Sequence, residues 1–344
     1  MSKYLSHDEI HSQYVSLKQT LDYMLENAAP LQELFQGEGD IVFVGCGSSY
    51  WMSLSAHKTV KLKTGRRSYA VKAGDVILCP EEYRGLYDKP VFLCPSRSGR
   101  TRELLDAVVL LLAAYPGAKV LSIVEYTENE LSGKSDLSLN LNWANERSVC
   151  QTRSFSNLYL ASIVLAAILG GDKAFIENMG SYLASAPGLY SRHEADIIKL
   201  ADPAAITSLV TLGGGLQYGV VIEGAYIVIE MAEFASNYYQ LLEYRHGPIV
   251  TSGQRTAVFI CSGVPEEHER KMAEETRKTG AKVYAIASKQ VDWADHTFSL
   301  DGEYGKEILA LHFAFVLQSF AHHFSIARGK NPDSPGDLVP YIVY

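Results

Sequence analysis

Residues 41–50, IVFVGCGSSY, are echoed by residues 209–218, LVTLGGGLQY. Each is a short apolar run that ends in glycines, as buried strands of parallel sheets do where they turn into a helix. Two further pairs of segments repeat in the same order: GAKVLSI at 117–123 with GAKVYAI at 280–286, and DLSLNL at 136–141 with HTFSL at 296–300. This repetition predicts two similar halves joined near residues 183–204. The alternative is that unrelated α/β units share a turn by coincidence.

Within the first half, strand-like and helix-like runs alternate. An apolar strand is predicted at 91–96, a helix at 103–115 and a second strand at 118–124. This alternation is typical of an α/β fold with a parallel sheet. Residues 8–35, ahead of the first strand, have apolar side chains at three- and four-residue intervals, which predicts helix.

The composition excludes several classes of protein. The chain has 344 residues, 47% hydrophobic and 20% charged, enough apolar material for one large or two ordinary domains. Its formal net charge is −8, so no chain-wide positive field favours nucleic acid. The five cysteines are scattered without CxxC spacing, which predicts buried reduced thiols rather than disulfides or a zinc site.

Nothing in the sequence predicts export or a membrane anchor. The first residues are polar, with no apolar stretch that resembles a signal peptide. The apolar runs at 104–115, 158–169, 218–234 and 308–324 are shorter than a membrane span or are interrupted by Asp, Glu or His. We expect buried helices of a soluble, cytoplasmic protein.

Two loops are candidates for binding an anion. Residues 96–101, SRSGRT, lie between a predicted strand and a helix, where hydroxyls and backbone N–H groups meet the positive end of a helix dipole. Residues 45–49, GCGSS, lie at a second such crossing, and both loops fall at the carboxyl edge of the sheet. Neither is a Walker loop or a dinucleotide fingerprint. The simpler interpretation is that the serines only cap helices.

An apolar helix predicted at 218–234 contains two carboxylates, Glu223 and Glu230, two turns apart on nearly one face. A carboxylate in an apolar pocket has a raised pKa and is a good general base near neutral pH. Alternatively, both are structural and paired with backbone N–H groups or an arginine.

The loop that follows contains His246 just before a Gly-Pro turn. An imidazole on such a rigid turn suits proton transfer, although a lone histidine is more often a surface or core residue. His322 and His323 have no carboxylate at metal-ligand spacing and are interpreted as an ordinary helix end. No metal site is therefore expected.

Five motifs together resemble the double sugar-isomerase (SIS) domain proteins, namely GCGSSY, SRSGRT, EGAYIVIE, EYRHGP and GKNPDSPGDLVPYIVY at 45–50, 96–101, 223–230, 243–248 and 329–344. That family includes the isomerase half of glucosamine-6-phosphate synthase and deglycases of 6-phosphorylated fructosyl amino acids. The resemblance implies two tandem flavodoxin-like subdomains, and a homodimer or higher homo-oligomer with its active site at a subunit boundary. No glutaminase half is present and the chain begins with Met, so we do not expect a complete synthase.

The resemblance also implies roles for residues. Glu230 is the base that moves a proton between C1 and C2, and His246 of a neighbouring subunit assists ring opening or protonates the leaving group. Gln151, Glu223 and Tyr344 are expected near the substrate. The residues expected to hold the sugar 6-phosphate are Gly47, Ser48, Ser49, Ser96, Arg97, Ser98, Gly99 and Thr101. Arg97 stands where the synthase has glutamine.

Two positions depart from the synthase pattern. Ile227 stands three residues before Glu230 where the synthase has lysine, and Pro340 stands where its tail has another. The deglycases resemble this chain in lacking both lysines and in ending in tyrosine. A lysine-assisted route is therefore not expected. We also predict no cofactor.

We predict an N-terminal helical segment at 1–34, subdomains at 35–190 and 191–330, and a tail at 331–344 over the active site. The predicted activity is deglycation of a 6-phosphorylated ketoamine, giving an aldose 6-phosphate and an amine. The alternatives are aldose–ketose isomerisation of an (amino)sugar 6-phosphate and, in another class, a non-catalytic phosphosugar sensor. The expected partner is a small sugar phosphate, with neither nucleic acid nor membrane.

Overall fold

The computed structural model describes residues 3–342 and contains two compact units. The first-sheet unit comprises Gln13–Glu146, Arg153–Gly180 and Val339–Tyr344. The second-sheet unit comprises Met1–Ser12, Arg147–Thr152 and Ser181–Leu338. Both units draw on separate stretches of the chain, and the domain boundaries predicted from the sequence stay a prediction.

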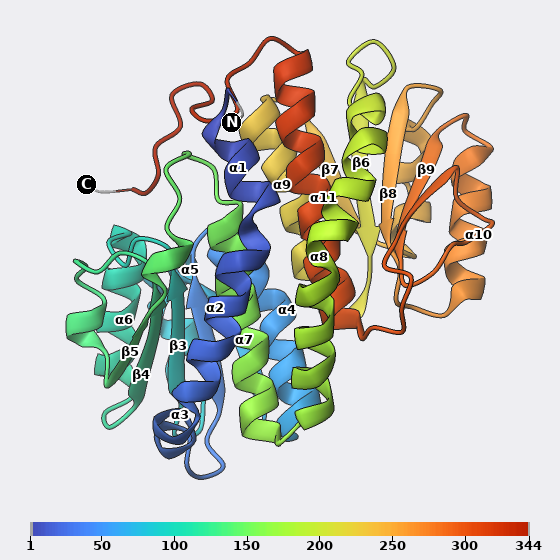
Figure 1. The fold of residues 1–344 in the computed structure, drawn as a ribbon. Helices are drawn as coiled ribbons and strands as arrows, with labels where there is room; N and C mark the ends of the chain where they lie inside the picture. Colours follow the sequence, from blue (N-terminus) through green and yellow to red (C-terminus); the bar gives the residue numbers. More distant parts are fainter. Residues whose placement is uncertain (1–2, 343–344) are drawn as a thin grey trace. The chain divides into compact units, whose positions relative to one another are not determined.

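The first-sheet unit is built on five parallel strands in the order β2-β1-β3-β4-β5. Helices α5 and α6 pack on one face, and α4 and α7 on the other (Figure 1). The strands are β1 Ile41–Gly45, β2 Ser68–Lys72, β3 Val91–Ser96, β4 Lys119–Val124 and β5 Leu137–Asn140. The helices are α2 Gln13–Glu26, α3 Ala28–Leu34, α4 Ser48–Thr64, α5 Ala73–Leu78, α6 Arg102–Ala114 and α7 Arg153–Gly170, with 3₁₀ turns η1 Pro80–Tyr83, η2 Ser132–Lys134 and η3 Asn142–Ala144.

The second-sheet unit has five parallel strands in the order β7-β6-β8-β9-β10. Helices α9 and α11 run beside each other along this sheet, while α10 covers its other face (Figure 1). The strands are β6 Ser208–Gly213, β7 Ser236–Gln240, β8 Thr256–Cys261, β9 Lys282–Ala287 and β10 His296–Ser299. The other elements are α1 Leu5–His11, α9 Tyr218–Ala232, α10 Glu266–Arg277 and α11 Lys306–Ala327, with 3₁₀ turns η4 Gly215–Gln217, η5 Glu243–Arg245 and η6 Pro248–Thr251. Helix α8, Lys173–Leu200, begins in one unit and ends in the other.

The two sheets have one topology, because each places its first strand second and its third strand in the middle. This is the flavodoxin-like 2-1-3-4-5 order. The repeated glycines also share a conformation: Gly47 and Gly215 have φ of +51° and +60°, and Gly117 and Gly280 have +87° and +92°. The predicted duplication of a parallel α/β unit is therefore confirmed.

Two helices, α7 and α11, are long and apolar enough to span a membrane by length and composition alone. In the structure, 83% and 94% of their most apolar stretches are buried. Both cover a sheet of their own unit. They are therefore core helices of the α/β units, as the sequence predicts.

The cysteines are free thiols in the structure. Cys94, Cys150 and Cys261 are buried as predicted, but Cys46 is half-buried and Cys79 is exposed. The expectation of burial is wrong for Cys79, because this residue ends the short helix α5 at the surface.

Candidate active site

The loop after β1 brings a helix start directly against the end of a strand. A Cβ on Gly45 would lie 2.9 Å from the backbone of Ser49 and Tyr50, so glycine allows α4 to begin this close. Gly47 has positive φ, and Ser48 and Ser49 are 4% and 5% exposed in the first turn of α4. The hydroxyl and amide groups of this turn are thereby held at the carboxyl end of β1.

The loop after β3 is a tight turn built around two buried serines. The Oγ of Ser96 accepts a hydrogen bond from the amide of Gly99 at 3.0 Å, and Ser98 Oγ accepts from the amide of Arg100 at 3.1 Å. Gly99 has φ of +59°, and a Cβ there would lie 2.5 Å from Asn129 Oδ1. A hydroxyl that accepts in this way still has its own O–H to donate to an anion.

The sheet order brings both loops to one place. Strands β1 and β3 are neighbours in the sheet, and their helices pack on opposite faces, which is the switch point where open α/β sheets bind ligands. Thr101 directly precedes α6, and its side chain makes no capping hydrogen bond within the described chain. The two predicted loops therefore meet at one edge, while their role in binding phosphate stays a prediction.

Part of the C-terminal segment lies against the second of these loops. Arg97 is 4% exposed, and its Nη2 donates a 2.6 Å hydrogen bond to the carbonyl of Pro340. Its Nη1 lies 3.7 Å from Glu146 Oε1. The amide of Arg102 donates to the carbonyl of Ile342 at 3.2 Å. These contacts place residues 340 and 342 of the predicted tail beside the loop. The last residue of the tail, Tyr344, lies outside the described residues.

The buried carboxyl groups of Glu125 and Glu146 lie behind this loop and were not predicted from the sequence. The amide of Glu125 donates to the carbonyl of Arg97 at 3.1 Å, and Ser154 Oγ donates to Glu125 Oε2 at 2.6 Å. Glu146 Oε2 accepts from the amide of Arg153 at 3.0 Å. Burial, and then the nearby charge of Glu146, raise the pKa of Glu125 to about 8. A signal was available, because Glu125 comes directly after an apolar strand at the edge where ligands bind.

In the second-sheet unit, α9 holds the two predicted carboxylates differently. Glu223 is 2% exposed, whereas Glu230 is half-buried. Tyr226 lies near both, since its burial and then the charges of Glu230 and Glu223 raise its pKa. A Cβ on Gly224 would lie 2.5 Å from Phe313, so this helix packs tightly on α11. The prediction of burial is confirmed for Glu223, while Glu230 is partly accessible to solvent.

His246 lies on a surface turn. It follows η5, its amide donates to the carbonyl of Glu243 at 3.0 Å, and its side chain is exposed. Gly247, with φ of +131°, turns the chain into η6. The nearby Leu242 and Val250 are 40% and 81% exposed. The turn thus presents an imidazole together with apolar side chains at the surface of its unit.

The loop after β8 corresponds to the serine loop of the first sheet, but an internal carboxylate fills it. Glu269 Oε1 accepts hydrogen bonds from the amides of Gly263 at 2.8 Å and Val264 at 3.1 Å. Its Oε2 accepts from Ser262 Oγ at 2.6 Å. Gln217 Nε2 donates to the carbonyl of Ser262 at 2.9 Å. The amides and the hydroxyl that could bind an external anion in this loop already donate to the carboxyl group of Glu269.

The predicted substrate-proximal Gln151 lies on a segment anchored from two sides. Gln318 Nε2 donates to the carbonyl of Thr152 at 2.9 Å, and Ser148 Oγ donates to Glu9 Oε2 at 2.6 Å. The Oε1 of Gln151 is shielded from solvent and has no hydrogen-bond partner within residues 3–342. This oxygen can accept a hydrogen bond from a ligand.

A cavity of the first-sheet unit lies away from these loops. It has a volume of about 420 Å³ and is lined by residues that begin β3 and β4, including Lys89, Pro90 and Lys119. These positions lie at the amino edge of the sheet, opposite the two loops, so this cavity is not part of the candidate site.

The duplicated parallel α/β fold and the hydroxyl-rich loops at one switch point agree with the resemblance to double-SIS proteins. The comparisons confirm this resemblance, although no protein-family model matches. The chain is 26% identical over 340 residues to the isomerizing glutamine–fructose-6-phosphate aminotransferase of Sulfolobus acidocaldarius, covering 96% of this chain and 55% of that one. Its Bacillus subtilis counterpart is 27% identical over 314 residues, 87% of this chain and 50% of its own. The chain thus spans about half the length of these relatives.

Solved structures agree with this relationship. Glucosamine-6-phosphate deaminase from Thermotoga maritima has a TM-score of 0.79 at 26% identity, covering 94% of this chain and 99% of that one. Tagatose-6-phosphate ketose/aldose isomerase from Escherichia coli has a TM-score of 0.86 at 21% identity, covering 98% and 96%, and it shows the shared fold. The chain is thus similar in sequence and fold to enzymes that act on sugar phosphates, and these comparisons support an enzyme.

Proposed function

We propose that this chain is a phosphosugar-processing enzyme whose substrate is a 6-phosphorylated ketoamine, the adduct of a sugar and an amino acid. One observation carries the proposal, the contrast between the two switch-point loops. The loop at Ser96–Thr101 offers hydroxyl groups at a helix start, while Glu269 already occupies the matching loop of the second sheet. One copy is therefore built to take an anion from outside.

The phosphate would be held by groups of fixed position. Two helix starts, at Ser48 and Arg102, converge on the switch point, and each directs backbone N–H groups and a positive dipole end toward an anion. The hydroxyls of Ser49, Ser98 and Thr101 would add donors. Such charge-assisted hydrogen bonds are short and strong, and they compensate for the chain's net charge of −8.

Glu230 is the proposed base. Its carboxylate would remove a proton from C1 of the ketoamine while a proton from solvent adds to the C2 oxygen, giving an enaminol. Glu230 would then return its proton to C2, which gives a protonated C1=N imine. Loss of the N–H proton to solvent leaves the neutral imine, and hydrolysis by water gives the aldose 6-phosphate and the free amine. The half-buried position of Glu230 suits a base that must both reach substrate and be partly desolvated.

His246 would act from a neighbouring subunit. Its exposed position between the apolar side chains of Leu242 and Val250 supports a subunit contact there. In the resulting homodimer or higher oligomer, the imidazole would assist ring opening or protonate the departing amine. A cytoplasmic location is part of this proposal, because sugar phosphates are charged and do not cross membranes unaided.

Two positions favour the deglycase over a lysine-assisted isomerase. Ile227 is 1% exposed within the core face of α9, and Pro340 contributes a carbonyl to Arg97. Neither supplies an amine for a Schiff base. The second candidate is isomerisation or deamination of an aminosugar 6-phosphate, which is favoured by the 26% identity to a solved glucosamine-6-phosphate deaminase.

The proposal is tested by incubating the protein with a panel of 6-phosphorylated Amadori compounds and aminosugar 6-phosphates. We expect free amine and aldose phosphate from the Amadori compounds. Turnover of aminosugar phosphates alone would support the second candidate. Tight binding without product by NMR would support a sensor and contradict both enzymatic proposals.

The role of Glu230 is tested by Glu230→Gln. Loss of a general base is expected to lower kcat by about 10²- to 10⁴-fold while the affinity for sugar 6-phosphate changes little. Glu267→Gln, at an exposed position of α10, is the matched control and should be fully active. Retention of most of the wild-type rate in Glu230→Gln would refute the assignment.

The role of His246 is tested by mixing two inactive variants, Glu230→Gln and His246→Asn, after subunit exchange. We assume that one subunit supplies the base and its neighbour the imidazole. Random exchange then makes about half of the dimers mixed, and each mixed dimer has one intact site out of two. The mixture should therefore regain about 25% of the wild-type activity. No regain after verified exchange would mean that both groups act from one subunit.

A further inference from the structure

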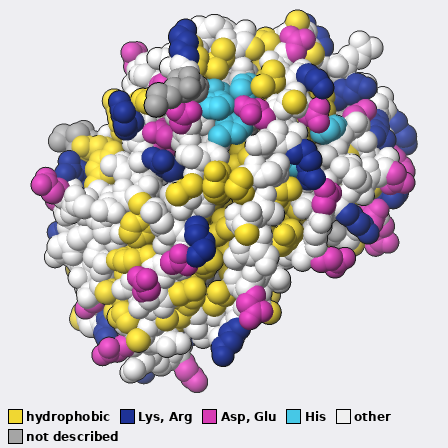
Figure 2. Space-filling model, viewed as in Figure 1, with side chains coloured by type: hydrophobic (Ala, Val, Ile, Leu, Met, Phe, Trp, Pro, Cys, Tyr) yellow, Lys and Arg dark blue, Asp and Glu magenta, His cyan; other side chains and the backbone are white. Residues whose placement is uncertain are grey.

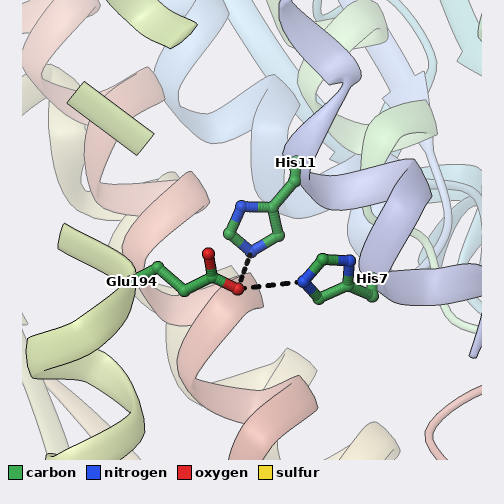
Figure 3. A group of neighbouring side chains, drawn as sticks. All are labelled: His7, His11 and Glu194. Atoms are coloured by element: carbon green, nitrogen blue, oxygen red, sulfur yellow. Dashed lines mark hydrogen bonds and ion pairs between the residues drawn. The ribbon is translucent and has the colours of Figure 1, made fainter. Parts of the chain in front are cut away.

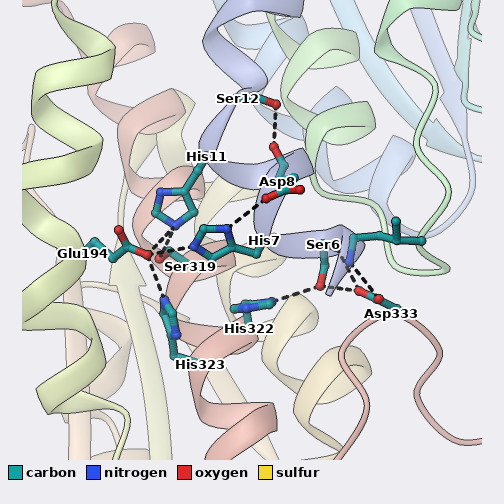
Figure 4. A network of polar contacts seen from close by, with 11 residues as sticks. Ser6, His7, Asp8, His11, Ser12, Glu194, Ser319, His322, His323 and Asp333 are labelled. Atoms are coloured by element: carbon teal, nitrogen blue, oxygen red, sulfur yellow. Dashed lines mark hydrogen bonds and ion pairs between the residues drawn. The ribbon is translucent and has the colours of Figure 1, made fainter. Parts of the chain in front are cut away.

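Histidine side chains gather in one place on the face of the molecule in Figure 2, with acidic side chains beside them. The histidine cluster comprises His7, His11 and His323 around the carboxylate of Glu194 (Figures 3 and 4). Oε1 of Glu194 lies 2.9 Å from Nε2 of His7, 3.6 Å from that of His11 and 3.7 Å from that of His323. All four residues belong to the second-sheet unit.

Three helices bring these side chains together. His7 and His11 are four residues apart on α1, so they share one face, and their rings stack with centroids 4.4 Å apart. Glu194 comes from α8 and His323 from α11. More than a hundred residues separate these helices along the chain, so a local pattern predicts only an ordinary helix end for His322 and His323.

The spacing matches a metal site better than an ion pair. A single His–Glu ion pair explains the contact between His7 and Glu194. The Nε2 atoms of His11 and His323 lie near the same carboxylate oxygen and are not explained by that pair. Nε2 of His323 is also buried without a hydrogen-bond partner within residues 3–342. A tetrahedral ion with bonds of about 2.0–2.1 Å separates its ligand atoms by about 3.3 Å. The observed distances of 2.9 to 3.7 Å bracket that value. The ligand atoms of His7, His11 and Glu194 all lie within 4.8 Å of one another.

The four side chains of the cluster lie near the surface of the unit. Side-chain exposures of 15% to 29% leave a path from solvent.

The surroundings hold the cluster in place, as Figure 4 shows. Nδ1 of His7 lies 3.3 Å from Asp8 Oδ1, the arrangement that orients metal-bound histidines. The start of α1 is anchored by Asp333, which accepts hydrogen bonds from the amides of Leu5 and Ser6 at 2.8 and 2.9 Å. His322 turns away toward Ser6 Oγ at 3.0 Å and is not part of the set.

We propose that the histidine cluster binds one divalent transition-metal ion, with His7, His11 and Glu194 as ligands and His323 nearest to the fourth position. Imidazole and carboxylate ligands without thiolate suit Zn²⁺, and also Co²⁺ and Ni²⁺. The ion would fasten α1 to α8 and α11. Because Glu9 of the same helix accepts the hydrogen bond from Ser148 Oγ, the ion would also steady the segment that leads to Gln151.

The test uses the full chain without a histidine tag, treated with chelator and then dialysed. Titration with ZnSO₄ followed by calorimetry should give one site per chain, and Co²⁺ should give the intense visible absorption of tetrahedral coordination. At a hundredfold excess over Kd, Zn²⁺ should raise Tm by roughly 5 °C.

Variants separate this site from adventitious binding. His7→Gln and His11→Gln should each weaken Zn²⁺ binding on the order of 100-fold, and His323→Gln about tenfold. His268→Gln is the matched control, because His268 Nε2 also lies 3.7 Å from a carboxylate, that of Glu267, but stands outside the cluster. Circular dichroism checks that each variant folds. Unchanged Zn²⁺ affinity in both α1 variants, or no saturable binding by the folded wild-type chain, would overturn the proposal.

Discussion

The two halves of this chain have the same backbone topology but different side chains in their switch-point loops. The strand order and the positive φ of Gly47 and Gly215 are the same in both. Yet Ser96 and Ser98 line the loop after β3, whereas Glu269 fills the loop after β8. Under the proposed function, side chains therefore decide whether a switch point of this fold holds a carboxyl group of its own chain or an anion from outside.

A single pair of residues illustrates the difference. Glu103 and Glu269 are each the seventh residue after the first serine of their loop, Ser96 and Ser262. Glu269 turns back to the loop amides, while Glu103 lies near Cys46, where burial and then this charge raise the thiol pKa to about 12. The same residue type at the same position therefore has a different partner, and the loops ahead of the two helices differ in sequence, SRSGRT against SGVPEE.

The largest effect is expected from placing a negative charge in the serine loop. Ser98→Asp should raise KM for the phosphorylated substrate by about 100-fold or more, because like charges in a buried site repel by several kcal/mol. Ser98→Asn, of similar size but neutral, is the control and should have a smaller effect. Steady-state kinetics measure both, and an equal KM for the two variants would contradict phosphate binding by this loop.

Removing the internal anion of the second loop should affect stability and not binding. Glu269→Ala leaves the amides of Gly263 and Val264 and the hydroxyl of Ser262 unpaired, at a cost of about 2–3 kcal/mol, or roughly 5–10 °C in Tm. KM should stay unchanged. Glu103→Ala is the matched variant of the first half, where the buried Oε2 has no hydrogen-bond partner within the described chain, and it should cost less. A strong rise of KM in Glu269→Ala would mean that the second loop binds substrate.

A third difference between the halves is the carboxyl group of Glu125 behind the serine loop, which changes how stability depends on pH. In the second half, Ser288 follows the matching strand. The pKa of Glu125 is about 8 in the folded chain and near 4.5 when unfolded. The unfolded chain therefore loses this proton first, and the group costs stability progressively as pH rises from 4.5 to 8.

Glu125→Gln removes this titration and keeps an oxygen that accepts from Ser154. Its stability relative to wild type should grow progressively between pH 4.5 and 8 and then level off. Denaturant unfolding at several pH values measures the difference. A difference that does not change with pH would contradict a raised pKa.

Much of the fold could be predicted from the sequence. The strand predicted at 91–96 is β3, and the helix predicted at 103–115 is α6 shifted by one residue. Local periodicity determines such elements, and a repeated turn with glycine at the same place reveals the duplication, because both depend on neighbours in the chain. The same reasoning identified the serine loops and Glu223, since strand ends and an apolar helix are local features.

Only the tertiary structure decided how side chains from distant elements meet. It left Glu230 half-buried, placed Glu269 across the second loop and brought Glu194 to three histidines. These outcomes depend on the angle and distance at which helices pack, and no local pattern encodes those. The sequence alone thus determined the duplicated sheets and the residue types at their edges, while packing determined which of these residues share a site.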